Sequence, residues 1–320
     1  MSLKLLSSAV ISIAAIYSAP VRADNVVNLN TTASTQSIAQ LTGDPSARST
    51  SGRDLQVISF EPKAALNKNT PRLLIQGGLH GNEGEASKFV LWLAGRFARG
   101  ESPLNQLSNQ NVAFDFLPYA NPDGHSNGTR SNIRGVNLNR NFGILWGISR
   151  ENPGAEKFSE AETQAIRRLF AKRHYTAAID VHGYVNWVVG PSAPEVIKSH
   201  GTKIDSTKVN AYRRWMNVLT TQAAALPGYK VKNGADLGDG GAFEDWAFWS
   251  QGTYAYCLEL ESAKRFAYAS NEDSPKQTGS IAANGGQVDL FLRYELFVYR
   301  TLAKAIDLAK DPSMPTLAGK

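Results

Sequence analysis

Short strand-like runs alternate along this chain with longer stretches whose apolar spacing is helical. Apolar runs of about 4 to 8 residues bounded by turn residues are typical of strands, and apolar residues three or four apart are typical of helices. The pattern predicts strands at Leu55–Phe60, Arg72–Gln76, Val112–Pro118, Thr176–Val181 and Thr253–Glu261. It predicts helices near Glu85–Arg99, Ser159–Arg173, Ser206–Ala225 and Val288–Leu308.

This alternation of strands and helices predicts an α/β layered fold with the sheet inside. In such folds, ligands gather beyond the carboxyl ends of the strands. His80 and His182 both come just after the end of a predicted strand. The order of elements therefore already places two histidines at the edge of the sheet where ligands bind.

The beginning of the chain has the features of an export signal. Residues 1–23 combine a positive start at Lys4, a mostly apolar or small stretch, and the small-x-small pattern Val21-Arg22-Ala23 that precedes signal cleavage. Interrupting serines make the stretch too short for a membrane-spanning helix, although an uncleaved anchor is the alternative. We expect an exported protein, periplasmic or secreted, with no stable membrane insertion after the signal is removed.

The rest of the chain divides into three parts on composition. Residues 24–50 are rich in Ser, Thr, Asn and Gln and are predicted to be a loosely structured lead-in. One domain is predicted at 51–312, followed by a tail at 313–320. A mature chain of this length lies within the single-domain range, and we expect it to be a monomer.

Composition narrows the classes of function. Cys257 is the only cysteine, so no intramolecular disulfide can form, and its apolar strand favours a buried, inert thiol. The net charge of +6 falls to +4 when Lys4 and Arg22 leave with the signal. No basic helix or basic-aromatic motif is present, so a nucleic-acid partner is not expected.

His80 and Glu83 form a candidate metal motif directly after the strand at 72–76. Imidazole plus carboxylate is a ligand set that suits zinc, and a catalytic zinc keeps three protein ligands and a water. His182, after the strand at 176–181, is the predicted third ligand. The alternatives are a surface hydrogen-bonded pair for His80 and Glu83, and an ordinary strand-end histidine for His182.

Two polar segments accompany the metal motif. Asn121–Gly124 is a turn, and the Gly135–Phe142 loop is dense in asparagine and arginine. Such a loop does not build a core, but it can present guanidinium and amide donors to an anion.

Together these segments resemble the zinc carboxypeptidases of the carboxypeptidase A type, in a compact bacterial form without a pro-domain. The matching segments, in order, are Ser51-Gly52-Arg53, His80-x-x-Glu83, Asn121–Gly124, Arg130–Phe142, Asp180-Val181-His182 and Leu258-Glu259-Leu260. The resemblance implies a three-layer α/β/α fold around a mixed, mostly parallel twisted sheet. It also implies one Zn²⁺ per chain and a peptide substrate.

The resemblance assigns a role to each site residue. His80, Glu83 and His182 would hold zinc, as in the two-His, one-Glu site of carboxypeptidase A, which is itself a standard example of a catalytic zinc centre. Glu259 would be the general base and Arg130 would stabilise the oxyanion. The substrate's terminal carboxylate would be bound by Asn139 and Arg140.

Several of these assignments have rivals within the sequence. Glu261 lies on the same side of its strand as Glu259, and Arg134 competes with Arg130. This chain has one residue more than the family between Gly241 and Asp245-Trp246, so the floor of the pocket for the terminal side chain is either Phe243, favouring apolar residues, or Glu244, favouring Lys, Arg or diaminopimelate. The alternative for Glu244 is a solvated loop acid.

The chain also departs from the family pattern at two positions. Asn137 stands where the family often has an aspartate that accepts a hydrogen bond from the first histidine. Gly234–Leu237 replaces the segment that carries a substrate-covering tyrosine in the digestive enzymes. Tyr229 is the nearest tyrosine, and we assign no catalytic tyrosine.

The expected function is that of an exported zinc metallocarboxypeptidase that removes the C-terminal residue of a peptide, either a peptidoglycan stem peptide (a muropeptide) or an ordinary peptide. The alternative enzyme is a zinc deacylase of N-acyl amino acids, of the aspartoacylase or desuccinylase type, which shares the His-Gly-Asn-Glu turn. A third alternative is an inactive module that binds peptide termini or cell wall.

Overall fold

A computed structural model describes residues 31–67, 69–204, 206–234, 238–261 and 281–311, with the side chains of 281–288 excepted. In this part of the chain, strands of one sheet lie in the order β1-β2-β4-β3-β5-β8-β6-β7. The strands are β1 Thr31–Ser37, β2 Gln56–Pro62, β3 Arg72–Gly77, β4 Ala113–Leu117, β5 Ala177–Gly183, β6 Trp187–Gly190, β7 Lys230–Asn233 and β8 Tyr254–Leu260. The central pairings β4-β3-β5-β8 are parallel, and the mixed, mostly parallel sheet is confirmed.

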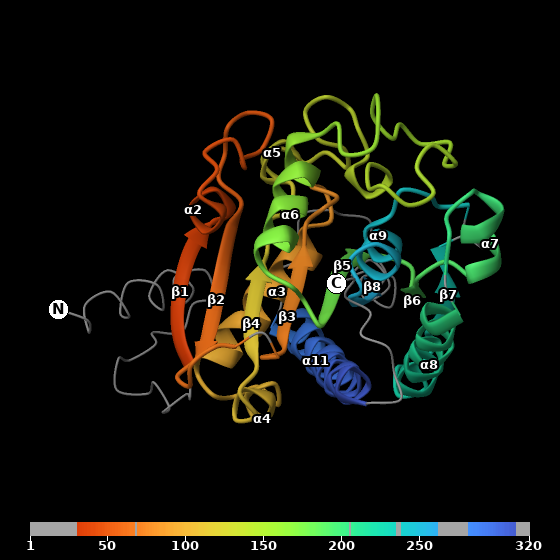
Figure 1. Cartoon of the computed structure of the whole chain (residues 1–320). Helices are drawn as coiled ribbons and strands as arrows, with labels where there is room; N and C mark the ends of the chain where they lie inside the picture. Colours follow the sequence, from red (N-terminus) through yellow and green to blue (C-terminus); the bar gives the residue numbers. More distant parts are fainter. Residues whose placement is uncertain (1–30, 68, 205, 235–237, 262–280, 312–320) are drawn as a thin grey trace.

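Helices cover both faces of the sheet. They are α2 Ile38–Thr42, α3 Gly84–Ala98, α4 Asn105–Ser108, α5 Pro122–Asn127, the 3-10 helix η2 Leu138–Arg140, α6 Ala161–Lys172, α7 Pro194–Ser199, α8 Ser206–Ala223, α9 Phe243–Trp249 and α11 Ile281–Lys310. Figure 1 shows α6 and α9 in front of the sheet and α3 behind it. This arrangement is the three-layer α/β fold expected from the sequence.

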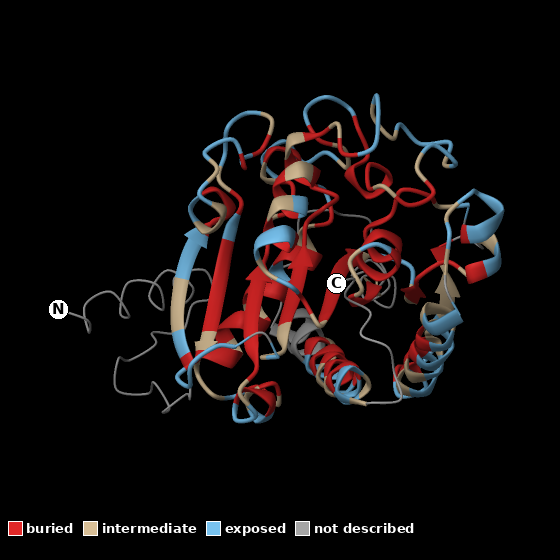
Figure 2. Ribbon diagram, viewed as in Figure 1, coloured by how far each residue is buried: buried red, intermediate tan, exposed pale blue. Residues whose placement is uncertain are grey.

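The central strands of the sheet are buried (Figure 2). Aromatic side chains pack on both faces of the sheet. Behind it, Phe97 of α3 packs on Phe60, Phe114 and Phe116 of β2 and β4. In front, Phe170 of α6 contacts Phe243 and Trp246 of α9. These layers fix the central strands from both sides, and they therefore fix the edge at which the functional side chains emerge.

The predicted loosely structured lead-in at 24–50 is wrong for residues 31–42. β1 pairs antiparallel with β2 from Thr31 to Ser37 and forms the edge of the sheet. An edge strand tolerates a polar sequence because one face remains in water. Ser37 then caps α2 by accepting from the Gln40 backbone N–H, while the Gln40 side chain accepts from the Ser37 N–H.

The other strands and helices expected from the sequence are present, with ends that differ by a few residues. The largest difference is α11, which begins at Ile281 rather than near Val288. Cys257 is buried, as expected. The predicted signal peptide and the tail at 313–320 lie outside the described residues. Within the described residues, none of the helices combines the length and the apolar character needed to cross a membrane.

Candidate active site

His80 and Glu83 lie on a tight turn between β3 and α3. Gly78 has a φ of +70°, which glycine adopts without strain. Gly81 packs so closely on Gly124 that an added Cβ would lie 2.1 Å from the Gly124 carbonyl carbon. The Glu83 N–H closes the turn by donating to the His80 carbonyl oxygen at 3.1 Å. The turn therefore depends on glycine, and it directs both side chains to the carboxyl edge of the sheet.

His182 reaches the same edge from β5, beside Glu259 of β8, with which it is in register. Its Nε2 atom lies 2.7 Å from Asp180 Oδ2. Asp180 and His182 project from the same side of the strand because side chains alternate. The Asp180 carboxylate thereby holds the imidazole so that Nδ1 is directed at His80 and Glu83.

The three candidate ligands converge. His182 Nδ1 lies 3.0 Å from His80 Nδ1 and 3.0 Å from Glu83 Oε2. His80 Nδ1 lies 2.9 Å from Glu83 Oε1. Among the described residues, these three offer ligand atoms that all lie within 4.8 Å of one another. All three residues are buried.

The donor set fits a zinc ion. Ligand bonds of about 2.0 to 2.1 Å in a tetrahedral site separate the ligand atoms by about 3.3 Å, close to the distances here. Metal-binding histidines usually bond their second nitrogen to a carboxylate or carbonyl group. His80 Nε2 lies 3.0 Å from Asn137 Oδ1, and His182 Nε2 contacts Asp180. Asn137 thus takes the position of the aspartate that the family often has, as a neutral acceptor.

Burial and neighbouring charge act differently on the three ligands. Burial lowers the pKa of His80, and the adjacent His182 lowers it further. Burial also opposes the charge of His182, but Asp180 and Glu83 outweigh this and hold its pKa well above the ordinary value. Burial alone would raise the pKa of Glu83, yet His182 and His80 hold it low. The two acids thus favour a positive charge at this point of the site, as a bound metal cation would supply.

Arg130 lies beside the metal ligands. Its Nη1 atom is 3.0 Å from Glu83 Oε1 and 2.9 Å from His80 Nδ1. Its rival Arg134 points elsewhere: the guanidinium is 56% exposed and lies 3.6 Å from Glu160. The structure thus brings Arg130, and not Arg134, to the place where a substrate carbonyl group would meet the metal.

Arg140 is buried at the end of η2 and surrounded by acceptors. Its guanidinium donates to Ser149 Oγ at 3.1 Å, to the Asn139 carbonyl oxygen at 2.8 Å, and to Asp239. Asn139 accepts from the Phe243 N–H at 2.8 Å through its side-chain oxygen, which ties η2 to the first residue of α9. The predicted carboxylate-binding pair is therefore rigidly placed.

Glu151 connects the two arginines of the site. Its Oε1 lies 3.1 Å from Arg140 Nη2, and its Oε2 lies 3.3 Å from Arg130 Nε. The Asn137 amide donates to the same Oε2. A carboxylate of the protein thus lies where the terminal carboxylate of a substrate would be bound, and its side chain is 42% exposed.

Glu259 is the acid nearest to the ligands in β8. Burial raises its pKa to about 7, and the neighbouring His182 lowers it only in part. Its Oε2 is buried without a hydrogen-bond partner among the described residues, and Cys257 Sγ lies 3.9 Å from Oε1. Its rival Glu261 lies past the end of β8. The register with His182 therefore favours Glu259 over Glu261.

Phe243 and Glu244 have separate environments at the start of α9. Phe243 packs between Phe142 and Trp246 in the aromatic layer. Glu244 is also buried, and its Oε2 has no partner among the described residues. Burial first, and Asp245 next, raise its pKa well above the ordinary value. An unpaired buried carboxylate is costly unless a ligand pairs with it, so the geometry favours Glu244 over Phe243 as the pocket floor.

The sequence profile of the zinc carboxypeptidases matches residues 36–284. The chain belongs to the zinc carboxypeptidase family. The match begins inside the predicted lead-in, in agreement with β1 and α2 being part of the fold.

Curated relatives of this family member include carboxypeptidase B of Astacus astacus, 24% identical over 271 residues, which cover 74% of this chain and 84% of the relative. An inactive metallocarboxypeptidase, ecm14, of Sclerotinia sclerotiorum is 23% identical over 280 residues, 73% of this chain. The chain spans only 47% of that relative's length.

Solved structures show the same fold. Carboxypeptidase A of Helicoverpa armigera superposes with a TM-score of 0.64 at 18% identity, covering 95% of this chain and 73% of the other. A metallo-carboxypeptidase of Burkholderia cenocepacia superposes with a TM-score of 0.57 at 18% identity, and the match covers 94% of this chain and 68% of the other. At such identities the likeness establishes the fold alone.

Sequence reasoning gave no role to Asp180, Glu151 or Asp239. Asp180 could have been found, because an acid two residues before a strand histidine projects from the same side. Glu151 lies 11 residues after Arg140 and Asp239 lies 99 residues after it, both in loops, and no periodicity points to them. Residues 235–237, part of the segment that replaces the family's tyrosine segment, lie outside the described residues. Tyr229 donates to the Glu259 carbonyl oxygen at 3.0 Å.

Proposed function

We propose that this family member is an exported zinc-dependent carboxypeptidase that hydrolyses the C-terminal peptide bond of peptides. The observation that carries the proposal is the convergence of His80, Glu83 and His182 beside Arg130 and Glu259. Family membership supports a hydrolase of this kind. The proposal includes one zinc ion per chain and a monomer, which metal analysis and sedimentation would check.

Zinc held by the two histidines and Glu83 would polarise the scissile carbonyl group and lower the pKa of a bound water. The Glu259 carboxylate would accept a proton from the attacking water and later deliver it to the leaving amine nitrogen. Burial raises the pKa of Glu259 to about 7 in the metal-free protein, and a bound cation would lower it, so the carboxylate needed to accept the proton would be present at neutral pH. Arg130 would donate to the developing oxyanion and stabilise it by charge and hydrogen bonding.

Arg140 and Asn139 bind the terminal carboxylate and thereby restrict cleavage to the chain end. The substrate carboxylate replaces Glu151 at Arg140. Glu151 is partly exposed, and exposed ion pairs contribute only about 0 to 1 kcal/mol, so this exchange costs little. The contact with Asp239 remains and keeps the guanidinium in place.

Glu244 selects a cationic terminal side chain. Its buried, unpaired oxygen would gain an ion pair from a lysine, arginine or diaminopimelate residue. Both peptidoglycan stem peptides and ordinary peptides can supply such an end. An exported enzyme with a modest basic excess would meet either substrate.

A terminal-residue panel tests the function. Blocked dipeptides ending in Lys, Arg, Phe or Glu, muropeptides, and an N-acyl aspartate are incubated with and without chelator and analysed by mass spectrometry. We expect cleavage of Lys and Arg ends, loss of turnover with chelator, and recovery with zinc. Preference for the N-acyl aspartate would favour the deacylase instead.

A second candidate follows from the relative described as inactive. In that case the chain would bind peptide ends or cell wall without cleaving them. The absence of turnover for every substrate after zinc loading, together with retained binding, would establish this candidate. Export is tested separately by N-terminal sequencing of the secreted or periplasmic protein, which should begin at Asp24.

A further inference from the structure

The end of β8 carries Glu259, but the sheet holds this end on one side only. β5 pairs with β8 as far as Leu260. On the other side, the register with β6 includes Cys257 and Leu258 and goes no further. The Glu259 carboxylate adds little restraint of its own, because its Oε2 has no hydrogen-bond partner among the described residues.

Two tyrosine hydroxyls bond the backbone where the β6 pairing stops. Tyr229 Oη lies 3.0 Å from the Glu259 carbonyl oxygen. Tyr294 Oη accepts from the Glu261 N–H at 2.9 Å. The two hydroxyls lie 2.6 Å apart. A hydroxyl group has one proton, so if Tyr229 donates to Glu259, Tyr294 donates to Tyr229, and the chain of bonds closes around Leu260.

We propose that Tyr229 and Tyr294 are positioning residues. Their chain of hydrogen bonds to the β8 backbone, called the tyrosine relay below, holds Glu259 in place for its own proton transfer; no proton passes through the tyrosines. Tyr229 comes from the segment between α8 and β7, and Tyr294 from α11. The relay thus ties the base-bearing end of β8 to two elements that do not otherwise bear site residues. This inference rests on the proposed role of Glu259.

Burial keeps the relay in its donating form. Tyr294 is fully buried, and burial raises its pKa to about 12. Burial first, and Tyr294 next, raise the pKa of Tyr229 far above its ordinary value. Both phenols therefore stay protonated across any working pH, and the relay does not titrate with the reaction.

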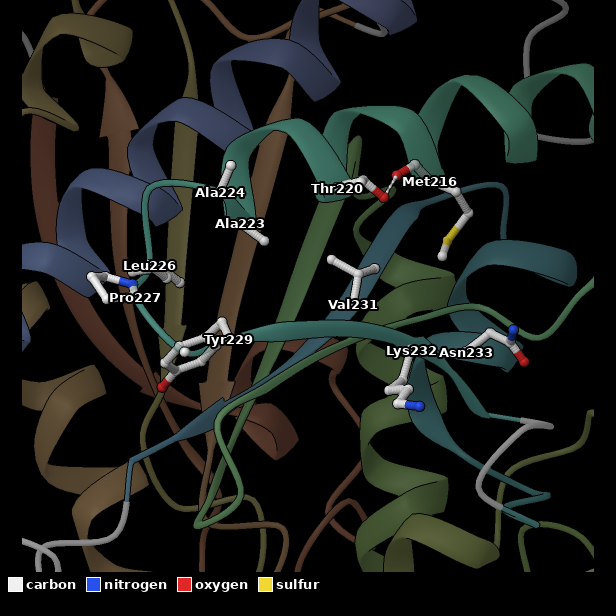
Figure 3. A pocket seen from close by; sticks show the side chains of 11 residues that line it. Met216, Thr220, Ala223, Ala224, Leu226, Pro227, Tyr229, Val231, Lys232 and Asn233 are labelled. Carbon is white, nitrogen blue, oxygen red and sulfur yellow. Dashed lines mark hydrogen bonds between the residues drawn. The ribbon is translucent and has the colours of Figure 1, made fainter.

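Tyr229 also borders a cavity of about 540 Å³ between the end of α8 and β7. Figure 3 shows its ring on the segment that leads into β7, with the hydroxyl pointing away from Met216, Thr220 and Val231. The cavity contains none of the proposed site residues, and the ring rather than the hydroxyl faces it. The hydroxyl is thus committed to the relay.

Tyr256 provides a matched control on the same strand. It is fully buried, and its hydroxyl lies 2.8 Å from Thr301 Oγ1 of α11. Tyr256→Phe therefore also removes a buried hydroxyl bond between β8 and α11. It leaves the backbone of Glu259 and Glu261 untouched.

The test compares Tyr229→Phe, Tyr294→Phe, their double variant and Tyr256→Phe, all zinc-loaded. We expect kcat to fall about tenfold or more in Tyr229→Phe with KM within about twofold, because small misplacements of a catalytic group are costly. The double variant should lose little beyond Tyr229→Phe, because both changes break one relay. Amide exchange at Glu261 should accelerate in the relay variants and not in Tyr256→Phe.

Equal kcat in Tyr229→Phe and wild type, or equal losses in Tyr229→Phe and Tyr256→Phe, would overturn the proposal. The exchange measurement separates this failure from failure of the proposed function. If the wild type cleaves no peptide but the relay variants still expose the Glu261 amide, the role of Glu259 is wrong and the relay is only structural. Unchanged exchange in every variant would show that the relay does not restrain β8.

Discussion

Two groups of charged residues inside the fold are built differently: one lies around Asp115, toward the amino ends of the central strands, and the other includes Glu259 of β8 and Glu244 of α9. In the first group, Asp115 of β4 is surrounded by donors: Ser59, Arg72, Arg173 and Tyr175. Both of its carboxylate oxygens have partners. At the carboxyl ends, Glu259 and Glu244 each keep one buried oxygen without a partner among the described residues.

The difference separates a structural cluster from a functional one. Charges buried for stability are paired and hydrogen-bonded, because an unpaired buried charge is costly. The amino-end group meets this condition completely. The carboxyl-end group does not: Glu259 and Glu244 each keep one unpaired oxygen, and Glu259 lies in register with the candidate ligand His182. Incomplete pairing at the edge where ligands bind is thus the physical mark of the site.

The largest expected effect comes from removing the proposed base. Glu259→Gln should lower kcat by about 10²- to 10⁴-fold, because general-base transfer is lost. Zinc content should stay near one per chain, and the free energy of unfolding should not fall, because a buried unpaired carboxylate becomes neutral. Steady-state kinetics and metal analysis check this. Full activity here, with an inactive Glu261→Gln, would move the base to Glu261.

Toward the amino ends of the strands, Asp115→Asn should destabilise the protein by about 3 to 5 kcal/mol, because two largely buried arginines lose one of their two counter-charges. The kcat of the folded fraction should stay close to that of the wild type. Urea unfolding and kinetics below the transition give both numbers. Glu61→Gln, which alters a more exposed partner of the same arginines, should cost less. If the Asp115→Asn variant were as stable as the wild type but had a reduced kcat, Asp115 would not be a structural residue, and the contrast between the two groups would fail.

Glu244→Gln should stabilise the protein in a pH-dependent way. The pKa of Glu244 is raised above its ordinary 4.5, so above pH 4.5 the folded state holds its proton more tightly than the unfolded state. Stability therefore falls as pH rises from 4.5, and the variant escapes this loss. We expect a gain of about 2 to 4 °C in Tm at pH 8 and none near pH 4.

Scanning calorimetry at several pH values measures that gain. Glu195→Gln, an exposed acid on α7, is the matched control and should show no such trend. The same Glu244 variant should lose the preference for cationic ends in the substrate panel. A constant change in Tm at all pH values would contradict the assignment of an unpaired, protonated carboxyl group.

The smallest effect is expected at Glu151. Glu151→Gln weakens the internal competitor for Arg140, so KM for peptides should fall about two- to fivefold with kcat unchanged, as befits an exposed ion pair. Inhibition by a free amino acid product should strengthen in parallel. A higher KM would instead mean that Glu151 orients the arginines for substrate.

The sequence predicted the layered fold because hydrophobic periodicity is local and survives in a single chain. It missed β1, whose polar side chains suit only an edge strand, and β6, β7 and α9, which are short. It also pointed to the three candidate metal ligands, which the fold brings together, because His80 and Glu83 share one turn and His182 follows a neighbouring strand. The choice between Arg130 and Arg134 required coordinates, since both lie on the same loop and differ only in direction.

By itself, the sequence determined that strands end in histidines and acids and that these ends meet at one edge of a parallel sheet. Only the tertiary structure decided which carboxylates remain unpaired there, because pairing depends on loops distant in sequence. Glu151 reaches Arg140 and Tyr229 reaches Glu259 through space rather than through periodicity. Local patterns fix elements, whereas the burial and partners of a charge are properties of the whole fold.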